Sequence, residues 1–85
     1  MIFYVRFPAH AEPPPEAVEE IVQTCISRFG SVIGASEDSI DVEMSDQAPV
    51  GVMAMLAAEL RAAGLPPDTV IAIPSRGQRL GIYEI

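Results

Sequence analysis

The chain has 85 residues, of which 49% are hydrophobic, and its twelve acidic residues and five arginines leave a formal net charge of −7. It contains no lysine, so nucleic acid is not an expected partner, because binding to nucleic acid depends on cationic side chains that neutralise phosphates. The longest uncharged apolar run, residues 48–58, is too short to span a bilayer, and no membrane association is expected.

This length predicts one domain over residues 1–85. A chain of this size buries only about 60–65% of the surface that it exposes when unfolded. The apolar fraction is high for such a domain, which predicts either self-association or cover by another protein. The single cysteine, Cys25, cannot form an internal disulfide, and there is no signal-peptide pattern, so we expect a cytoplasmic protein.

Residues 2–7, IFYVRF, predict a strand because β-branched and aromatic residues dominate them. The apolar side of this strand is expected to face the helices, and Ile2, Tyr4 and Arg6 form its opposite side. A proline-rich loop then leads into an amphipathic helix that is expected to begin near Pro14 or Pro15 and to stop at Gly30. Its apolar face consists of Val18, Ile21, Val22, Cys25, Ile26 and Phe29.

Two short strands are predicted over residues 31–36 and 39–44, joined by a turn at Glu37 and Asp38. Gly34 is expected to mark a bulge or a sheet edge. In the second strand, apolar residues alternate with Asp41 and Glu43, so one face is expected to be buried and the other to be wet.

The segment from Ser45 to Pro74 gives the strongest structural signal and contains a helix predicted over residues 49–64. Pro49 suits the first helical position, and Gly64 suits the left-handed conformation that closes a helix. One face is predicted to follow Val50, Met53, Ala54, Ala57 and Leu60, but other apolar residues lie off it. A helix that is apolar all round is either deeply buried or shared with a partner.

Residues 69–73, TVIAI, predict an interior strand, residues 75–78 a turn, and residues 79–85 a last strand. The order of elements predicts an α+β fold of the ferredoxin-like βαββαβ type. Two helices would lie on one face of an antiparallel-rich sheet with an extra C-terminal strand, and each crossover would be right-handed.

Candidate catalytic groups are few. His10 is a weak candidate for a general base at the end of the first strand, and no second histidine is present to build a metal site. Cys25, on the apolar helix face, is expected to be an inert core thiol. We expect no metal and no cofactor.

The favoured hypothesis is therefore a non-catalytic module that works by self-association, as a homodimer, or by docking on a larger protein. The expected interaction residues are Tyr4, Arg6, Asp41, Glu43, Arg76, Arg79 and Tyr83. Two alternatives remain open. One is a small enzyme or ligand-binding protein of the dimeric ferredoxin-like barrel type, with a pocket near His10. The other is an acidic inhibitor, of the immunity-protein type, that binds a basic partner.

Overall fold

The computed structural model describes residues 1–10, 12–46 and 51–84. Its elements, in chain order, are β1 (Ile2–Arg6), α1 (Pro15–Ile26), β2 (Gly30–Ala35), β3 (Ser39–Met44), α2 (Gly51–Ala62), β4 (Val70–Ile73), the 3-10 turn η1 (Pro74–Arg76) and β5 (Gln78–Gly81). The described residues thus form an α+β fold with two α-helices and one five-stranded sheet. Neither described helix has the length and apolarity needed to cross a membrane.

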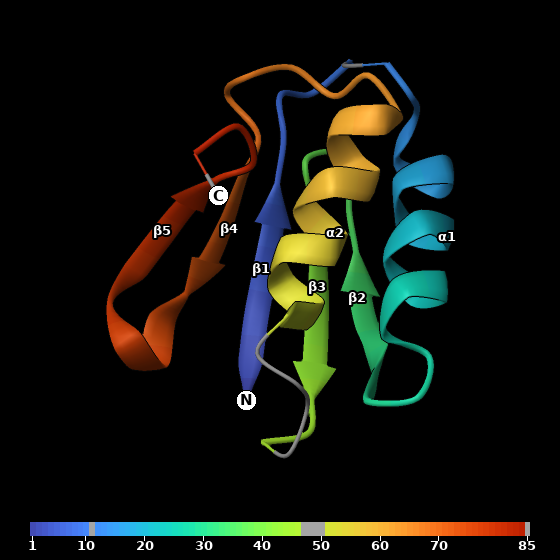
Figure 1. Cartoon of the computed structure of the whole chain (residues 1–85). Coiled ribbons are helices and arrows are strands. Elements are labelled where there is room, and N and C mark those ends of the chain that lie inside the picture. The colour runs from blue at the N-terminus through green and yellow to red at the C-terminus, as the bar shows by residue number, and fades with distance from the viewer. Residues whose placement is uncertain (11, 47–50, 85) are drawn as a thin grey trace.

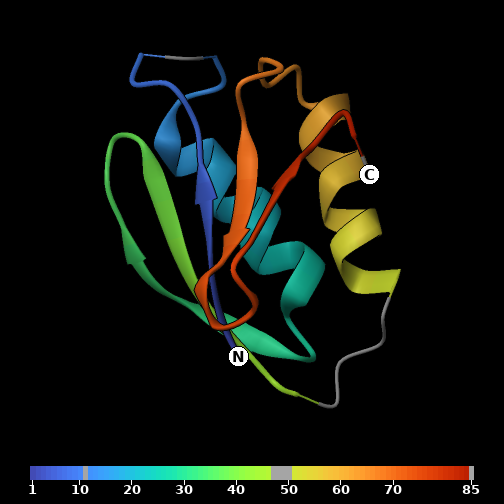
Figure 2. The same ribbon diagram turned by 90° about the vertical axis from the view of Figure 1, so that its left-hand side faces the viewer.

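The strands lie in the order β2-β3-β1-β4-β5, and every neighbouring pair is antiparallel. β1 is therefore central, and β2 and β5 form the two edges. Both helices lie on one face of the sheet and run antiparallel to each other (Figures 1 and 2). This order of strands and helices is compatible with the expected ferredoxin-like arrangement, with β5 added beyond β4.

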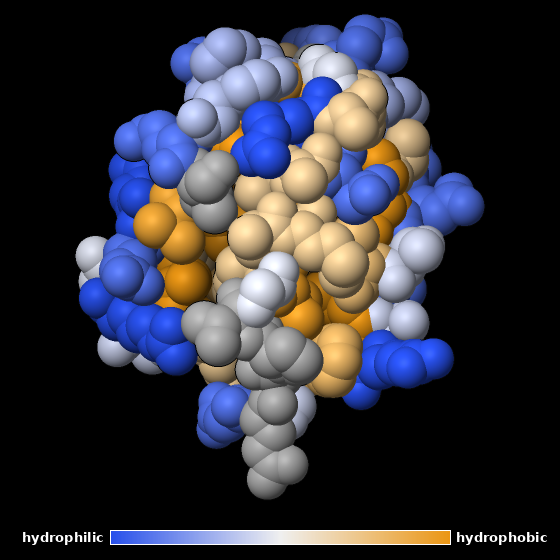
Figure 3. All heavy atoms as spheres, viewed as in Figure 1, coloured by the Kyte–Doolittle hydropathy of each residue, from blue (hydrophilic) through white to orange (hydrophobic). Residues whose placement is uncertain are grey.

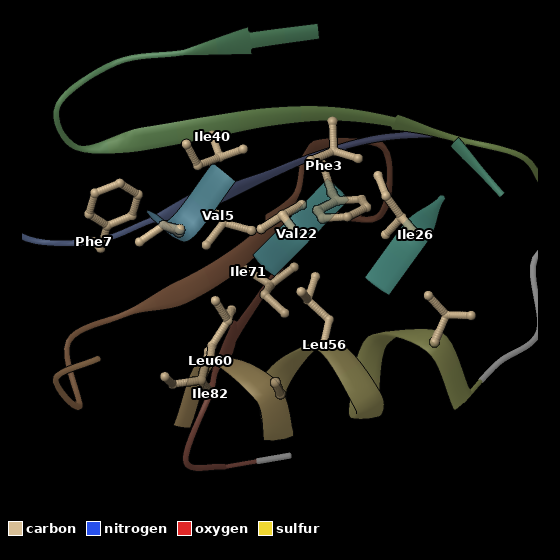
Figure 4. Packing of buried hydrophobic residues seen from close by; sticks show 14 of the residues in the cluster. Phe3, Val5, Phe7, Val22, Ile26, Ile40, Leu56, Leu60, Ile71 and Ile82 are labelled. Atoms are coloured by element: carbon tan, nitrogen blue, oxygen red, sulfur yellow. The ribbon is translucent and has the colours of Figure 1, made fainter. Parts of the chain in front are cut away.

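The core lies between the sheet and the two helices, as Figure 4 shows. In the register of the sheet, Phe3 is opposite Val42 and Val5 is opposite Ile40, so these buried side chains share one face. They meet α1 and α2 through fully buried side chains such as Val22 and Leu56. The alternation predicted for β1 and β3 is confirmed.

α1 begins at Pro15, as predicted, but it ends at Ile26 with Ser27 as its C-cap, four residues before Gly30. Gly30 instead opens β2. A Cβ atom at this position would collide with the carbonyl oxygen of Glu43 on the neighbouring strand. The glycine therefore serves the close approach of two strands, and the prediction that it stops the helix was wrong.

α2 begins at Gly51, and the predicted roles of Pro49 and Val50 lie outside the described residues. Gly64 adopts a φ of 89°, in the left-handed region predicted for the helix end. The buried face, however, is rotated from the predicted one, because Ala54 is exposed. The larger branched side chains, spaced by four residues, face the core together with one alanine: Val52, Leu56, Ala57 and Leu60.

The residue pattern predicted the edge strand β2 better than the edge strand β5. β2 lies at an edge, and its register shifts between Val32 and Gly34, so the prediction that Gly34 marks a bulge or a sheet edge is confirmed. β5 is shorter than the predicted strand over residues 79–85, of which residue 85 is outside the described part. The Ile82 amide still donates to the Thr69 carbonyl at 3.1 Å, and the chain then turns, with the Glu84 amide donating to the Gly81 carbonyl at 2.9 Å.

Candidate functional site

No described helix covers the second face of the sheet, which we call the open face (Figure 2). Because successive side chains of a strand point to opposite faces, the buried positions of Phe3 and Val5 leave the residues between them on this side. The pairing of the strands defines the open face as Ile2, Tyr4, Arg6, Asp41, Glu43, Val70, Ala72 and Arg79. Five of the seven predicted interaction residues therefore share one surface.

A single row of paired residues crosses the middle of the open face. Asp41 on β3 is opposite Tyr4 on β1, Tyr4 is opposite Ala72 on β4, and Ala72 is opposite Arg79 on β5. Neighbouring strands lie about 4.8 Å apart. A carboxylate therefore lies one strand from the aromatic ring on one side, and a guanidinium lies two strands from it on the other.

Two local contacts orient the side chains of this row. The Arg6 guanidinium lies over the Tyr4 ring, 5.4 Å from its centroid, which is within the range of a cation–π interaction. The Ser39 hydroxyl donates a hydrogen bond to Asp41 Oδ1 at 2.9 Å. Gly34 on β2 leaves room for this carboxylate, because a Cβ atom there would come 3.1 Å from Asp41 Oδ2. The aromatic and acidic groups are thus held in place by contacts within the chain itself.

The other predicted interaction residues are more dispersed. Glu43 is on the open face, where it lies opposite Ile2, and the Ile2 side chain is 41% exposed. Arg76 is exposed in η1, at the tip of the hairpin between β4 and β5. Tyr83 lies in the turn after β5, not in a strand, and its hydroxyl donates to the Leu65 carbonyl at 2.9 Å. Arg76 and Tyr83 are therefore not part of the row.

His10, the weak catalytic candidate, is exposed in the loop between β1 and α1 and has a φ of 67°. Residues 1–10, 12–46 and 51–84 contain no cluster of three or more His, Cys, Asp or Glu side chains that would hold a metal ion. The space between the sheet and the helices is occupied by the apolar core. The residues around His10 thus offer surface chemistry and not an enclosed site.

A groove between α1 and α2, on the side away from the sheet, was not predicted. It is lined by side chains of both helices: Ala17, Glu20, Ile21, Thr24, Cys25, Met55 and Glu59. Cys25 is half-buried here, although its position on the apolar helix face predicted a core thiol. Burial, and then the negative charge of Glu59, raise the pKa of this thiol. The low reactivity expected of Cys25 agrees with this direction.

The sequence of α1 contains part of the information about this groove. Ala17, Ile21 and Cys25 recur every four residues, so they lie on one face of the helix. The contribution of Met55 and Glu59 depends on how the two helices pack, which the sequence pattern did not specify. Comparisons of the chain with protein-family models, with characterised proteins and with solved structures found no match that would assign it to a family.

Proposed function

We propose that this protein is a non-catalytic association module of the ferredoxin-like class that forms a homodimer through the open face of its sheet. The observation that carries the proposal is the row from Asp41 through Tyr4 to Arg79, which has opposite charges at its two ends. Uncovered sheet faces with apolar residues at their centre are surfaces that a partner typically covers. Here the opposite charges at the two ends of the row favour a second copy of the chain as the partner.

The row is self-complementary for one choice of symmetry axis. Face-to-face packing of two copies requires a two-fold axis that lies between the sheets and parallel to them. An axis parallel to the strands, between β1 and β4, sets Asp41 of each copy opposite Arg79 of the other. An axis perpendicular to the strands sets like charges opposite each other, which is unfavourable. The charges therefore favour one closed dimer over its alternative.

The packed core supports a non-catalytic role over the enzyme alternative. A barrel-type enzyme would need a pocket near His10, whereas that side chain is exposed in a loop and the interior is apolar. The same features are compatible with docking on a larger protein through the open face. We also propose that the module acts in the cytoplasm, where a reducing environment keeps a single thiol such as Cys25 free.

The charge pair gives a direct test of the dimer. We expect the wild-type chain to dimerise in analytical ultracentrifugation at low salt. Asp41→Arg should weaken the dimer by about tenfold or more, because symmetry sets two new arginines opposite Arg79. The single variant Arg79→Asp should act likewise. Combining both substitutions restores opposite charges and should recover most of the lost affinity.

Arg28→Asp is the matched control for Arg79→Asp, because it makes the same charge change at an exposed residue after α1, in the helical layer. It should leave the dimer unchanged. A wild-type chain that remains monomeric at millimolar concentration would contradict the proposal. So would a double variant that dimerises no better than either single variant, since the row would then not lie across the interface.

A further inference from the structure

The groove between α1 and α2 is a second surface, on the opposite side of the molecule from the open face. Its floor is formed mainly by apolar side chains, including Ile21 and Met55, the latter 46% exposed. Figure 3 views this side of the molecule and shows apolar residues across its middle, over α2, with hydrophilic residues around them. A dimer formed through the open face of the sheet would leave this surface of the helical layer exposed.

The shape of the groove suits a third helix. α1 and α2 lie side by side and run antiparallel, so the groove between them follows both helix axes (Figure 1). Ala17, Ile21 and Cys25 line it over eight residues of α1, or about 12 Å at a rise of about 1.5 Å per residue. Side chains spaced by four residues form the ridges into which another helix packs. The groove thus matches the helix-in-groove mode of recognition.

The charges that line the groove indicate what kind of helix would bind in it. Among the described residues that line it, Glu20 on α1 and Glu59 on α2 are the ones that carry a formal charge, one on each wall. Glu16 and Glu19 extend the acidic surface along α1, where they line the adjoining hollows. The raised pKa of the Cys25 thiol is consistent with a site of low polarity and negative potential. A complementary helix therefore has an apolar face with basic residues on both flanks.

A second copy of this chain does not provide such a helix. α1 contains no basic residue, and α2 contains one, Arg61, whose guanidinium donates a hydrogen bond to the carbonyl oxygen of Ile82. The acidic face of another α1 would be repelled by Glu20 and Glu59. We propose that the groove binds an amphipathic helix of another protein, with lysine or arginine flanking the apolar face of that helix.

Cys25 provides a local readout of this binding because it lines the groove and is the only cysteine of the chain. The probe is a synthetic helical peptide of leucine and lysine, with leucine on one face and lysine on both flanks. We expect it to slow alkylation of Cys25 in the full chain by at least fivefold at saturation. A peptide with glutamate in place of lysine, and one with alanine in place of leucine, should give no protection.

Substitutions in the groove test whether the peptide binds there. Glu20→Gln and Glu59→Gln should each weaken binding of the leucine–lysine peptide by about two- to fivefold, as expected for exposed ion pairs. Glu84→Gln is the matched control, because Glu84 is exposed in the C-terminal turn. It should leave the affinity unchanged. In a Cys25→Ser background, Ser75→Cys moves the thiol to an exposed position in η1, where the peptide should not slow alkylation.

Several outcomes would overturn the proposal. Equal losses of affinity in Glu84→Gln and Glu59→Gln would mean that the peptide responds only to net charge. Protection by the alanine–lysine peptide would mean that the apolar floor is not engaged. Protection of Cys25 that increases with protein concentration alone would mean that a second copy occupies the groove. Because Arg79→Asp affects only the open face, it should disrupt the proposed dimer without changing peptide binding, so the two proposals fail independently.

Discussion

The side chain of Thr69 is fully buried just before β4, and its hydroxyl has no hydrogen-bond partner among the residues that the structure describes. A buried polar group without a partner lowers stability, because it gives up hydrogen bonds to water. Thr69→Val keeps the shape and removes the hydroxyl. We therefore expect the free energy of unfolding, measured by urea denaturation, to increase by about 1 kcal/mol.

Thr69→Ser is the matched control, because it keeps the hydroxyl and removes the methyl group. It should lower the free energy of unfolding by about 1 kcal/mol, the usual cost of losing a buried methyl group. Both variants should be compared with wild type at one protein concentration, so that self-association does not enter the difference. A loss of stability in Thr69→Val would indicate that the hydroxyl is hydrogen-bonded in solution.

The reactivity of the Cys25 thiol should depend on pH in a way that can be predicted. Burial, followed by the charge of Glu59, raises the pKa of its thiol, so less thiolate is present at neutral pH than in a free cysteine. The rate of alkylation should therefore reach half its maximum at a higher pH than in a short cysteine peptide. Glu59→Gln removes the smaller cause, so it should lower this midpoint only partly. An unchanged midpoint in Glu59→Gln would show that burial alone raises the pKa.

Strands and helices were predictable from the sequence where one residue pattern dominated them. Strict alternation in β1 and β3 assigned their buried and wet faces correctly, which also assigned Tyr4 and Asp41 to the open face. The buried face of α2 was predicted incorrectly, because small and apolar residues occur all around the helix and its pattern does not single out one face. The size of the side chains decided the outcome, since the larger Leu56 and Leu60 are buried and Ala54 is exposed.

The candidate site was predictable in its composition but not in its arrangement. Charged and aromatic residues on wet strand faces follow from alternation within each strand. The row that joins Asp41, Tyr4 and Arg79 depends on the register of four strands, which the residue pattern of each separate strand does not specify. The groove between α1 and α2 likewise depends on helix packing. In physical terms, local patterns assign faces, and tertiary pairing decides which faces meet.

Pairing of the edge strand β2 with β3 depends on a glycine. A Cβ atom at Gly30 would collide with the Glu43 carbonyl oxygen, so Gly30→Ala must displace backbone. We expect it to lower the free energy of unfolding by about 1–3 kcal/mol, the range for steric overpacking. Gly51→Ala is the control, because a Cβ atom there comes within 4 Å of no described residue beyond the neighbouring helix backbone, and alanine favours the helix.

Thermal unfolding followed by circular dichroism distinguishes these two glycine variants. Gly51→Ala should leave the melting temperature of the protein unchanged or raise it slightly, whereas Gly30→Ala should lower it. Equal effects of both substitutions would mean that the edge of the sheet adapts to the added methyl group. The close approach of β2 and β3 would then not be a structural requirement.

The two candidate surfaces lie in different layers of the molecule and have different chemistry. The open face combines opposite charges with an aromatic residue, whereas the described charged residues that line the mainly apolar groove are all carboxylates. A face with both charges suits a copy of itself, whereas a face with one charge suits a partner of the opposite charge. The high apolar fraction of this short chain is thus distributed between a core and two surfaces that a partner would cover.

Self-association should contribute to the stability of the fold, because a partner that binds only the native state shifts the unfolding equilibrium toward that state. A hundredfold increase in protein concentration through the range of the dimer should add about 1 kcal/mol per chain. For a domain of this size, that raises the melting temperature by about 4–8 °C. Arg79→Asp should move this dependence to concentrations that are higher by about tenfold or more, whereas its matched control Arg28→Asp should leave it unchanged. A melting temperature independent of concentration in the wild-type chain would mean that the domain is stabilised by its own core alone.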